Sequence, residues 1–445
     1  MRTIGSMALL LLLLCGSVTA QERNYSLKAL TADLDYLQQQ LYNVHADPYS
    51  ELDKKKWDGL FERMRTQLKD SMTAAAFYKI VKPAISYLSD EHAELTAPGY
   101  FTNRALFLPF SLKATPAGFM TDTVWGNSVL KKGDRIAAVN NVPVAELLQQ
   151  LNTYTTGFPD ERKEKTLVQF GYLYGLSHPF ENTWNITLAD GKKLSIQPIA
   201  SRDWMDYLKN VYGTGQNKQT LSYKTSGKTG YLTVPDFSVK RDGGLDQWRH
   251  KIDSFFALAA NDGVSRMVID VSRNGGGNSA VGTVLIDHFY SKPYKSYQMN
   301  WRRSDEYLAV ARSYGSTDDE YANLAPGKVL HRDSHQERPS ESTPKFKGKV
   351  YVVVGNGTFS SAIMFASIIK DNRMAILIGE SPSMGHPTHF GELYSTKLPN
   401  TGLPLRFGVK EWIRPAGKKI ANRLEPDVLI AAPTAEKVLA FLENK

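Results

Sequence analysis

The stretch KVYVVVGNGTFSSAIMFASIIKDNRMAILIGE, residues 349–380, contains two apolar runs separated by a segment of helical spacing. Both runs, VYVVV and AILI, are nearly continuous in apolar residues, which is typical of strands covered on both faces of a sheet. The segment between them has the length of a helical crossover, and such crossovers join parallel strands with a right-handed turn. The stretch therefore predicts part of an α/β layer built on a parallel sheet.

The same alternation of strands and helices precedes this stretch. Alternating elements of these lengths define an α/β core, which we place at residues 222–440. A polar stretch at 302–349 interrupts the alternation, and we interpret it as a long insertion between a helix and a strand. Strands are predicted in TGYLTVPDF (229–237) and RMVIDVS (266–272), and helices in LDQWRHKIDSFFALAA (245–260) and NSAVGTVLIDHFY (278–290).

Two further regions precede the core. Residues 21–98 contain apolar residues at helical spacing, beginning with a stripe of leucines at 27, 30, 34, 37 and 41, and predict a small helical domain. Residues 99–205 contain short apolar runs with turn residues between them and predict a β-rich domain. Within it, KKGDRIAAVNNVPVAELLQQL (131–151) has the order turn, strand, Asn-Asn turn and helix.

The first twenty residues have the composition of a secretory signal. Arg2 precedes the apolar run MALLLLLLC, and VTA resembles a cleavage site before Gln21. Cys15, the only cysteine, lies inside the run, so the mature chain would have neither thiol nor disulfide. A lipoprotein anchor at Cys15 is the alternative, which Leu14 disfavours because it is a poor residue before such a cysteine. We expect an exported protein, periplasmic or extracellular.

Charge and hydropathy argue against two function classes. The chain has 54 basic and 45 acidic side chains, a net charge of +9, but the basic residues are scattered along it. Nucleic-acid binding is therefore not expected. After the first twenty residues, no segment approaches the ~20 apolar residues that a membrane span requires.

Ser360 and Ser361 stand where the predicted strand VYVVV gives way to the predicted helix, at the start of that helix. The first turn of a helix has unpaired N–H groups and the positive end of the helix dipole, so an oxyanion formed there would be stabilised. A serine in this place is a candidate nucleophile. The alternative is that Thr358, Ser360 or Ser361 only caps the helix.

A glycine-rich loop follows the predicted strand RMVIDVS. Its three glycines, Gly275, Gly276 and Gly277, let the backbone approach a ligand and turn its N–H groups inward, which suits an oxyanion hole. The alternative is a phosphate-binding turn, but the loop has neither the Lys-Ser/Thr of a P-loop nor the GxGxxG spacing. Sites in parallel sheets lie beyond the carboxyl ends of the strands, and two of these ends carry the loop and Ser360.

A hydroxyl nucleophile needs a base, and three histidines are candidates. His92 follows two acidic residues at the end of the third predicted helix, and His386 and His389 lie in MGHPTHFGE after the strand AILI. The residues alone leave the choice among them open. His331 and His335 lie in the polar insertion with no helical register to bring them together, so no metal site is predicted.

Separate segments of the chain resemble the tail-specific or C-terminal processing peptidases, relatives of the tricorn protease core and of interphotoreceptor retinoid-binding protein. Residues 270–277 resemble the D-L-R-x-N-x-G-G signature of this family, and TFSSA (358–362) resembles its T-x-S-A/S-x-E nucleophile turn. GDRIAAVNNVPV (133–144) resembles the GDxIxxINGxPV run of its PDZ-like module. SDEHAEL (89–95) resembles the D-G-H-T element that precedes this module in one branch. The resemblance covers nearly all of the mature chain.

The resemblance implies a role for each residue that matches a motif. Ser360 matches the nucleophile, and the N–H groups of Ser361 and of Gly275 or Gly276 match the oxyanion hole. The chain departs from the family pattern at Ile363, where the nucleophile turn usually carries Glu.

The base also departs from the commonest pattern. Many members use a lysine after the serine, but the corresponding segment GESPSMGH (379–386) contains none. The tricorn-like branch instead uses the histidine of the D-x-H element, which His92 matches. His386 and His389 are the reserve candidates.

The resemblance further implies a fold and an activity. The fold is a ClpP/crotonase-like ββα layered core with an N-terminal helical domain and a PDZ-like domain. The activity is that of a serine endopeptidase without a cofactor, whose PDZ-like domain would bind the C-terminus of a peptide or protein substrate by strand addition. One alternative is a catalytically inactive protein that binds a peptide or a hydrophobic ligand on the same fold. A crotonase-like acyl-CoA enzyme conflicts with the export signal and lacks a CoA-binding signature.

Overall fold

The computed structural model describes residues 22–126, 129–212, 220–239, 244–315, 318–382, 385–417 and 423–444. The predicted signal segment, residues 1–20, lies outside the described residues.

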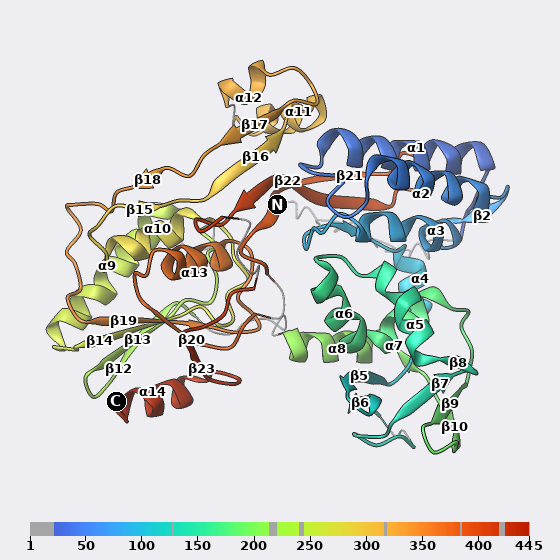
Figure 1. Ribbon diagram of the computed structural model, residues 1–445, viewed down its shortest axis with the longest axis horizontal. Helices are drawn as coiled ribbons and strands as arrows, with labels where there is room; N and C mark the ends of the chain where they lie inside the picture. The colour runs from blue at the N-terminus through green and yellow to red at the C-terminus, as the bar shows by residue number, and fades with distance from the viewer. Residues whose placement is uncertain are drawn as a thin grey trace, which may run out of the picture.

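A six-stranded sheet forms the centre of the α/β part (Figure 1). Its strands lie in the order β12-β13-β14-β19-β20-β23, and every neighbouring pair except β12 and β13 is parallel. The α/β class predicted from the alternation is thereby confirmed. The six strands are β12 (Ser222–Ser226), β13 (Thr229–Thr233), β14 (Arg266–Asp270), β19 (Lys349–Val354), β20 (Ile376–Gly379) and β23 (Val428–Leu429).

Helices cover both faces of this sheet. Successive side chains of a strand point to opposite faces, so both faces of a parallel strand need cover. Met267 and Ile269 of β14 belong to the core shared with α9, α10 and α13, whereas Val268 belongs to the core shared with α14. The four helices are α9 (Leu245–Asn261), α10 (Ala280–Asp287), α13 (Ser361–Asp371) and α14 (Ala435–Glu443).

A second, antiparallel sheet reaches from the α/β part to the N-terminal helices (Figure 1). Its order is β17-β16-β22-β21, and β3 also pairs with β22. The helices share one apolar core with the long β21–β22 hairpin. The elements are β3 (Glu94–Leu95), β16 (Gln298–Arg302), β17 (Val329–Arg332), β21 (His389–Lys397), β22 (Pro404–Ile413), α1 (Leu27–Val44), α2 (Lys54–Gln67) and α3 (Ala74–Ser86).

The stretch 302–349, interpreted from its polarity as an insertion, contains two short helices, α11 (Asp305–Ser313) and α12 (Asp319–Asn323). Tyr307 and Tyr321 are buried, and Tyr321 stacks on Trp301 with ring centroids 3.7 Å apart. These rings, with Leu308 and Leu330, join the core of the hairpin and the N-terminal helices, so a few apolar side chains anchor a mostly polar stretch.

The segment predicted to be β-rich contains as much helix as strand. The order predicted around the Asn-Asn turn is confirmed: β7 precedes Asn140 and Asn141, whose φ angles of 44° and 64° suit a tight hairpin turn, and β8 and α5 follow. The elements are α4 (Gly99–Arg104), β4 (Leu106–Phe107), β5 (Phe110–Thr115), β6 (Gly118–Val124), β7 (Ile136–Val139), β8 (Val142–Pro143), α5 (Val144–Leu151), α6 (Pro159–Val168), α7 (Phe170–Ser177), β9 (Trp184–Leu188), β10 (Lys193–Ile196), β11 (Ile199–Ala200) and α8 (Ser201–Tyr212).

None of the helices within the described residues is long and apolar enough to cross a membrane.

Candidate active site

Ser360 lies at the turn from β19 to α13, directly before the first residue of the helix. Its φ of 52° is unusual for a residue with a side chain, and its own side chain does not cap the helix. Two hydrogen bonds tie the turn to the segment after β14. Phe359 N–H donates to the Asn274 carbonyl at 2.9 Å, and Thr358 Oγ1 donates to the Val271 carbonyl at 2.8 Å. These contacts fix a strained turn in which Ser360 is half-buried.

The glycine loop after β14 lies directly against this turn. A Cβ atom added to Gly276 would lie 2.8 Å from the Cβ of Ser360 and 2.9 Å from the N of Ser361. Gly276 also has a φ of 95°, which residues with side chains rarely adopt. The predicted meeting of the two strand ends therefore occurs, and only glycine allows it.

The two glycines that were predicted as oxyanion donors differ in this structure. Gly276 N–H donates to the side-chain oxygen of buried Asn274 at 2.9 Å, so it is already engaged. Gly275 lines the cavity beside Ser360, and no hydrogen bond of its N–H is found among the described residues. Of the two glycines, Gly275 is therefore the better placed to donate its N–H to an oxyanion. The N–H of Ser361, at the helix N-terminus, would be the second donor.

His92 is the predicted histidine that meets Ser360. Its Nε2 lies 3.4 Å from Ser360 Oγ, at the long end of a hydrogen bond, and its ring packs on Phe359 with centroids 4.8 Å apart. The side chain is 10% exposed. Burial lowers the pKa of His92 below its usual value, which the nearby Asp90 carboxylate only partly offsets. A neutral imidazole is the form that can accept a proton from the serine.

Asp90 holds the backbone of His92 and was not singled out from the sequence. Its Oδ1 accepts the His92 N–H at 2.7 Å and lies 3.8 Å from His92 Nδ1. Its Oδ2 accepts the Gly408 N–H at 2.7 Å and lies 3.5 Å from Nε2 of buried His45. Burial alone would raise the pKa of Asp90, but His45, His92 and the Gly408 N–H lower it to about 2. The residue is therefore a carboxylate beside the imidazole, and an acid two positions before the histidine was the available signal.

His389 lies behind His92 rather than against the serine. Its Nδ1 donates to the His386 carbonyl at 2.9 Å, and its ring centroid lies 6.2 Å from that of His92. Complete burial, together with His92, lowers the pKa of His389 to about 4, so this ring is neutral. It also lines the cavity.

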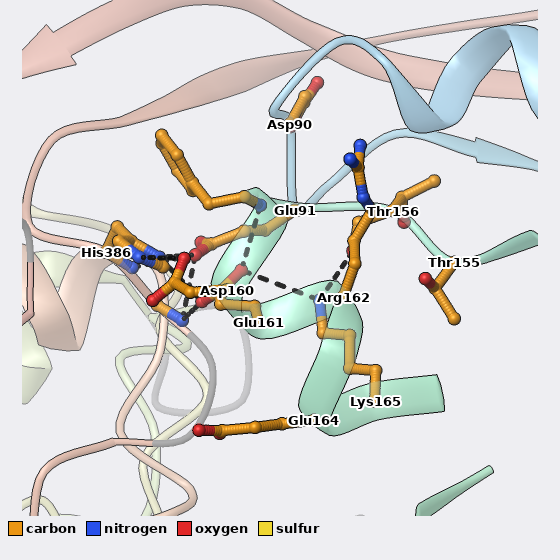
Figure 2. Close-up of polar contacts among 12 residues, drawn as sticks. Asp90, Glu91, Thr155, Thr156, Asp160, Glu161, Arg162, Glu164, Lys165 and His386 are labelled. Atoms are coloured by element: carbon orange, nitrogen blue, oxygen red, sulfur yellow. Dashed lines mark hydrogen bonds and ion pairs between the residues drawn. The ribbon is translucent and has the colours of Figure 1, made fainter. Parts of the chain in front are cut away.

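His386 is held in a buried cluster and has no described contact with Ser360. Figure 2 shows its ring beside the side chains of Glu91 and Glu161. Its Nδ1 lies 2.9 Å from Glu91 Oε1 and 2.7 Å from Glu161 Oε1. Of the three candidate histidines, only His92 is within hydrogen-bond reach of the serine among the described residues.

A cavity of about 570 Å³ opens over this arrangement. Apolar side chains, Phe359, Met364, Leu393 and Trp412, form part of its wall, and exposed Arg406 adds a positive charge. A larger cavity of about 790 Å³ lies between the N-terminal helices and the segment with α7, and contains none of the predicted site residues.

His331 and His335 do not converge. His331 pairs with Asn300 and Asp333, and His335 pairs with Ser296 and Glu337.

The fold and the paired serine and histidine define the class as a serine-type hydrolase. Residues 228–430, which span most of the α/β part, match the sequence model of Peptidase family S41. This match makes the chain a serine-type peptidase.

Solved structures of similar fold cover nearly the whole chain. Mature CPAF is 15% identical, with a TM-score of 0.60 over 91% of this chain and 92% of that chain. Mature CPAF complexed with lactacystin is 14% identical, with a TM-score of 0.59 over 90% of this chain and 93% of that chain. The photosystem II D1 C-terminal processing protease is 14% identical, with a TM-score of 0.43 over 91% and 93%. No curated protein sequence matches the chain.

Proposed function

We propose that the chain is an exported serine endopeptidase of the tail-specific type, with Ser360 as the nucleophile and His92, in place of a lysine, as the base. The observation that carries the proposal is the 3.4 Å between His92 Nε2 and Ser360 Oγ at the N-terminus of α13. A base in hydrogen-bond reach of a hydroxyl, with a third group beside the base, is the arrangement that activates a serine.

The reaction follows from this geometry. Ser360 Oγ bonds to the peptide carbonyl carbon while His92 Nε2 accepts the hydroxyl proton. The oxyanion receives hydrogen bonds from the N–H groups of Gly275 and Ser361. The imidazolium then donates its proton to the leaving amine as the C–N bond breaks, and a water repeats both steps to release the acid from Ser360. Nε2 can accept only if the ring proton is on Nδ1, the nitrogen that faces Asp90.

The departure at Ile363 does not argue for an inactive protein. Ile363 is fully buried in the core between α13 and the sheet. Its side chain therefore replaces no group in the cavity, and we favour the peptidase over a ligand-binding protein on the same fold.

Recognition of a substrate C-terminus and export are part of the proposal. The strand, Asn-Asn turn and helix order from β7 to α5 supports a PDZ-like role for this segment, and the leader-like first twenty residues support export.

The test is to trap the acyl-enzyme. The chain without residues 1–20 is incubated with peptide esters of varied C-terminal residues, quenched in acid, and analysed by mass spectrometry. We expect an acyl adduct on the peptide that contains Ser360, absent in Ser360→Ala and retained in Ser361→Ala. An adduct on another residue, or hydrolysis that persists in Ser360→Ala, would contradict the proposal. Because a structure of mature CPAF, which has a similar fold, is a complex with lactacystin, that compound is a second probe.

A further inference from the structure

The segment that carries His92 is tied to two other parts of the chain by a buried cluster of Glu91, Glu161 and His386. Glu91 precedes β3, Glu161 belongs to α6, and His386 lies in the loop between β20 and β21. Their side chains are 1%, 2% and 5% exposed. Glu91 Oε1 accepts the N–H groups of Gly385 at 3.1 Å and His386 at 2.8 Å, and Glu161 Oε1 accepts the Gly385 N–H at 3.0 Å.

We propose that this cluster is a lock that positions His92 against Ser360, with one proton retained by the two glutamates. Glu91 precedes His92 directly in the chain. Its side chain and that of Asp90 therefore both fix the turn that carries His92. The loop that donates to Glu91 continues to His389, which lies behind His92. The inference rests on the proposed roles of Ser360 and His92.

The shared proton follows from the two buried carboxyl groups, whose oxygens lie within 4.8 Å of each other, because two carboxylates in one buried place repel. Three negative groups other than Glu91 face it or its neighbours: Glu161, Asp160 at 3.3 Å from His386 Nε2, and Glu164. Three positive groups oppose them: His386, Lys165 at 3.8 Å from Glu161 Oε2, and Arg423, which pairs with Asp160 and Glu164. An ionised Glu91 would place a second negative charge directly beside the Glu161 carboxylate.

The pKa shifts of the three groups agree with one proton between the two glutamates. Burial and the neighbouring Glu161 carboxylate raise the pKa of Glu91 to about 8. Burial would also raise the pKa of Glu161, but hydrogen bonds from Glu91 and His386 lower it to about 2. Burial would lower the pKa of His386, but its hydrogen bonds to Glu161 and Glu91 raise it to about 10. At neutral pH Glu161 is ionised, whereas Glu91 and His386 are protonated. As the pH rises further, Glu91 loses its proton before His386 does, and the lock weakens above about pH 8.

A divalent cation is the other occupant that two carboxylates and an imidazole suggest, since their ligand atoms lie within 4.8 Å of one another. The surroundings favour the proton. Two backbone N–H groups already point at Glu91 Oε1, and the Lys165 ammonium adds positive charge that would repel a cation.

The experiment compares Glu161→Gln, Glu91→Gln and the control Glu164→Gln, which removes only a half-exposed surface pair with Arg423. Gln at 161 keeps the acceptor for the Phe158 N–H that starts α6. We expect Glu161→Gln to lower kcat by about 10–100-fold with little change in KM, because a base displaced by about 1 Å costs rate rather than binding. Glu91→Gln imitates the protonated side chain, so the alkaline fall of kcat near pH 8 should vanish. Glu164→Gln should match the parent chain.

Three outcomes would overturn the lock: unchanged kcat in Glu161→Gln, an alkaline fall that persists in Glu91→Gln, or a bound metal ion that both variants lose. Hydrogen exchange separates the lock from the proposed function, because it needs no activity. Glu161→Gln should exchange faster in residues 88–92 and 385–389, and equal exchange would overturn the lock even if the parent chain cleaved no peptide.

Discussion

At the scale of single residues, the site depends on a glycine that has no function of its own. Alanine at Gly276 would place a methyl group 2.8 Å from Ser360 Cβ at a positive φ. We expect Gly276→Ala to lower kcat/KM by at least about 100-fold, because the serine must shift. The matched control is Gly191→Ala, which has a φ of 86° and nothing within 4 Å of the added atom. Both variants lose stability, by about 1–3 kcal/mol, but only the first should lose activity; equal peptidase rates would refute the close approach.

Protonation of His92 should cause kcat/KM to fall at acidic pH. The neutral ring is the active form, and burial lowers its pKa, so kcat/KM should rise with pH through a midpoint below the ordinary histidine value of about 6.5. Asp90→Asn removes a nearby negative charge that favours the imidazolium, so the midpoint should move lower still. Rates measured between pH 4 and pH 8 check both statements. A midpoint above pH 7 would point to another base.

At the scale of elements, the turn from β19 to α13 is anchored on the end of β14. Thr358 is fully buried, donates to the Val271 carbonyl and accepts the Gly355 N–H at 3.0 Å. We expect Thr358→Val to lower the free energy of unfolding by about 1–3 kcal/mol, because two buried backbone groups lose their partner. Thr115→Val, whose hydroxyl bonds within an exposed hairpin, is the control and should cost less than about 1 kcal/mol. Urea denaturation of both variants decides; equal losses would show that the anchor contributes nothing.

The elements of the α/β core could be predicted because their signals are local. The apolar runs of β19 and β20 and the helical spacing of α13 are readable within the stretch 349–380. The two short helices between β16 and β17 could not be predicted, because their stability comes from rings such as Tyr321 that pack on distant Trp301. Helix propensity, summed over the residues of a polar stretch, takes no account of such contacts.

The residues of the site divide in the same way. Ser360 and the glycine loop follow from the edge of the sheet where their strands end. The role of Asp90 depends on Gly408 and His45, and the cluster at His386 depends on Glu161, all far away in the sequence. Pairings between such distant segments leave no periodic pattern.

At the scale of the whole molecule, the N-terminal helices must stay docked for His92 to reach the serine. Asp33 of α1 is fully buried and accepts hydrogen bonds from the backbone and side chains of Asn400 and Thr401, at the tip of the β21–β22 hairpin. We expect Asp33→Ala to cost about 2–4 kcal/mol in the free energy of unfolding, because four hydrogen bonds to a fully buried carboxylate are lost.

The control for this junction is Asp35→Ala on the same helix. Asp35 is mostly exposed and pairs with Arg65 at the surface, so its loss should cost less than about 1 kcal/mol. Guanidinium denaturation followed by tryptophan fluorescence compares the two variants. If the two variants unfold at the same denaturant concentration, the hairpin tip does not hold the helices.

The labelling rate of Ser360 by a fluorophosphonate tests the central claim most directly, because this reagent reports how strongly the hydroxyl is activated without requiring a known substrate. The account predicts that His92→Gln slows labelling by about 10²–10⁴-fold, whereas His389→Gln, which removes the ring behind it, slows it far less. Labelling that survives in His92→Gln and is lost in His389→Gln would contradict the account and assign the base to the other imidazole.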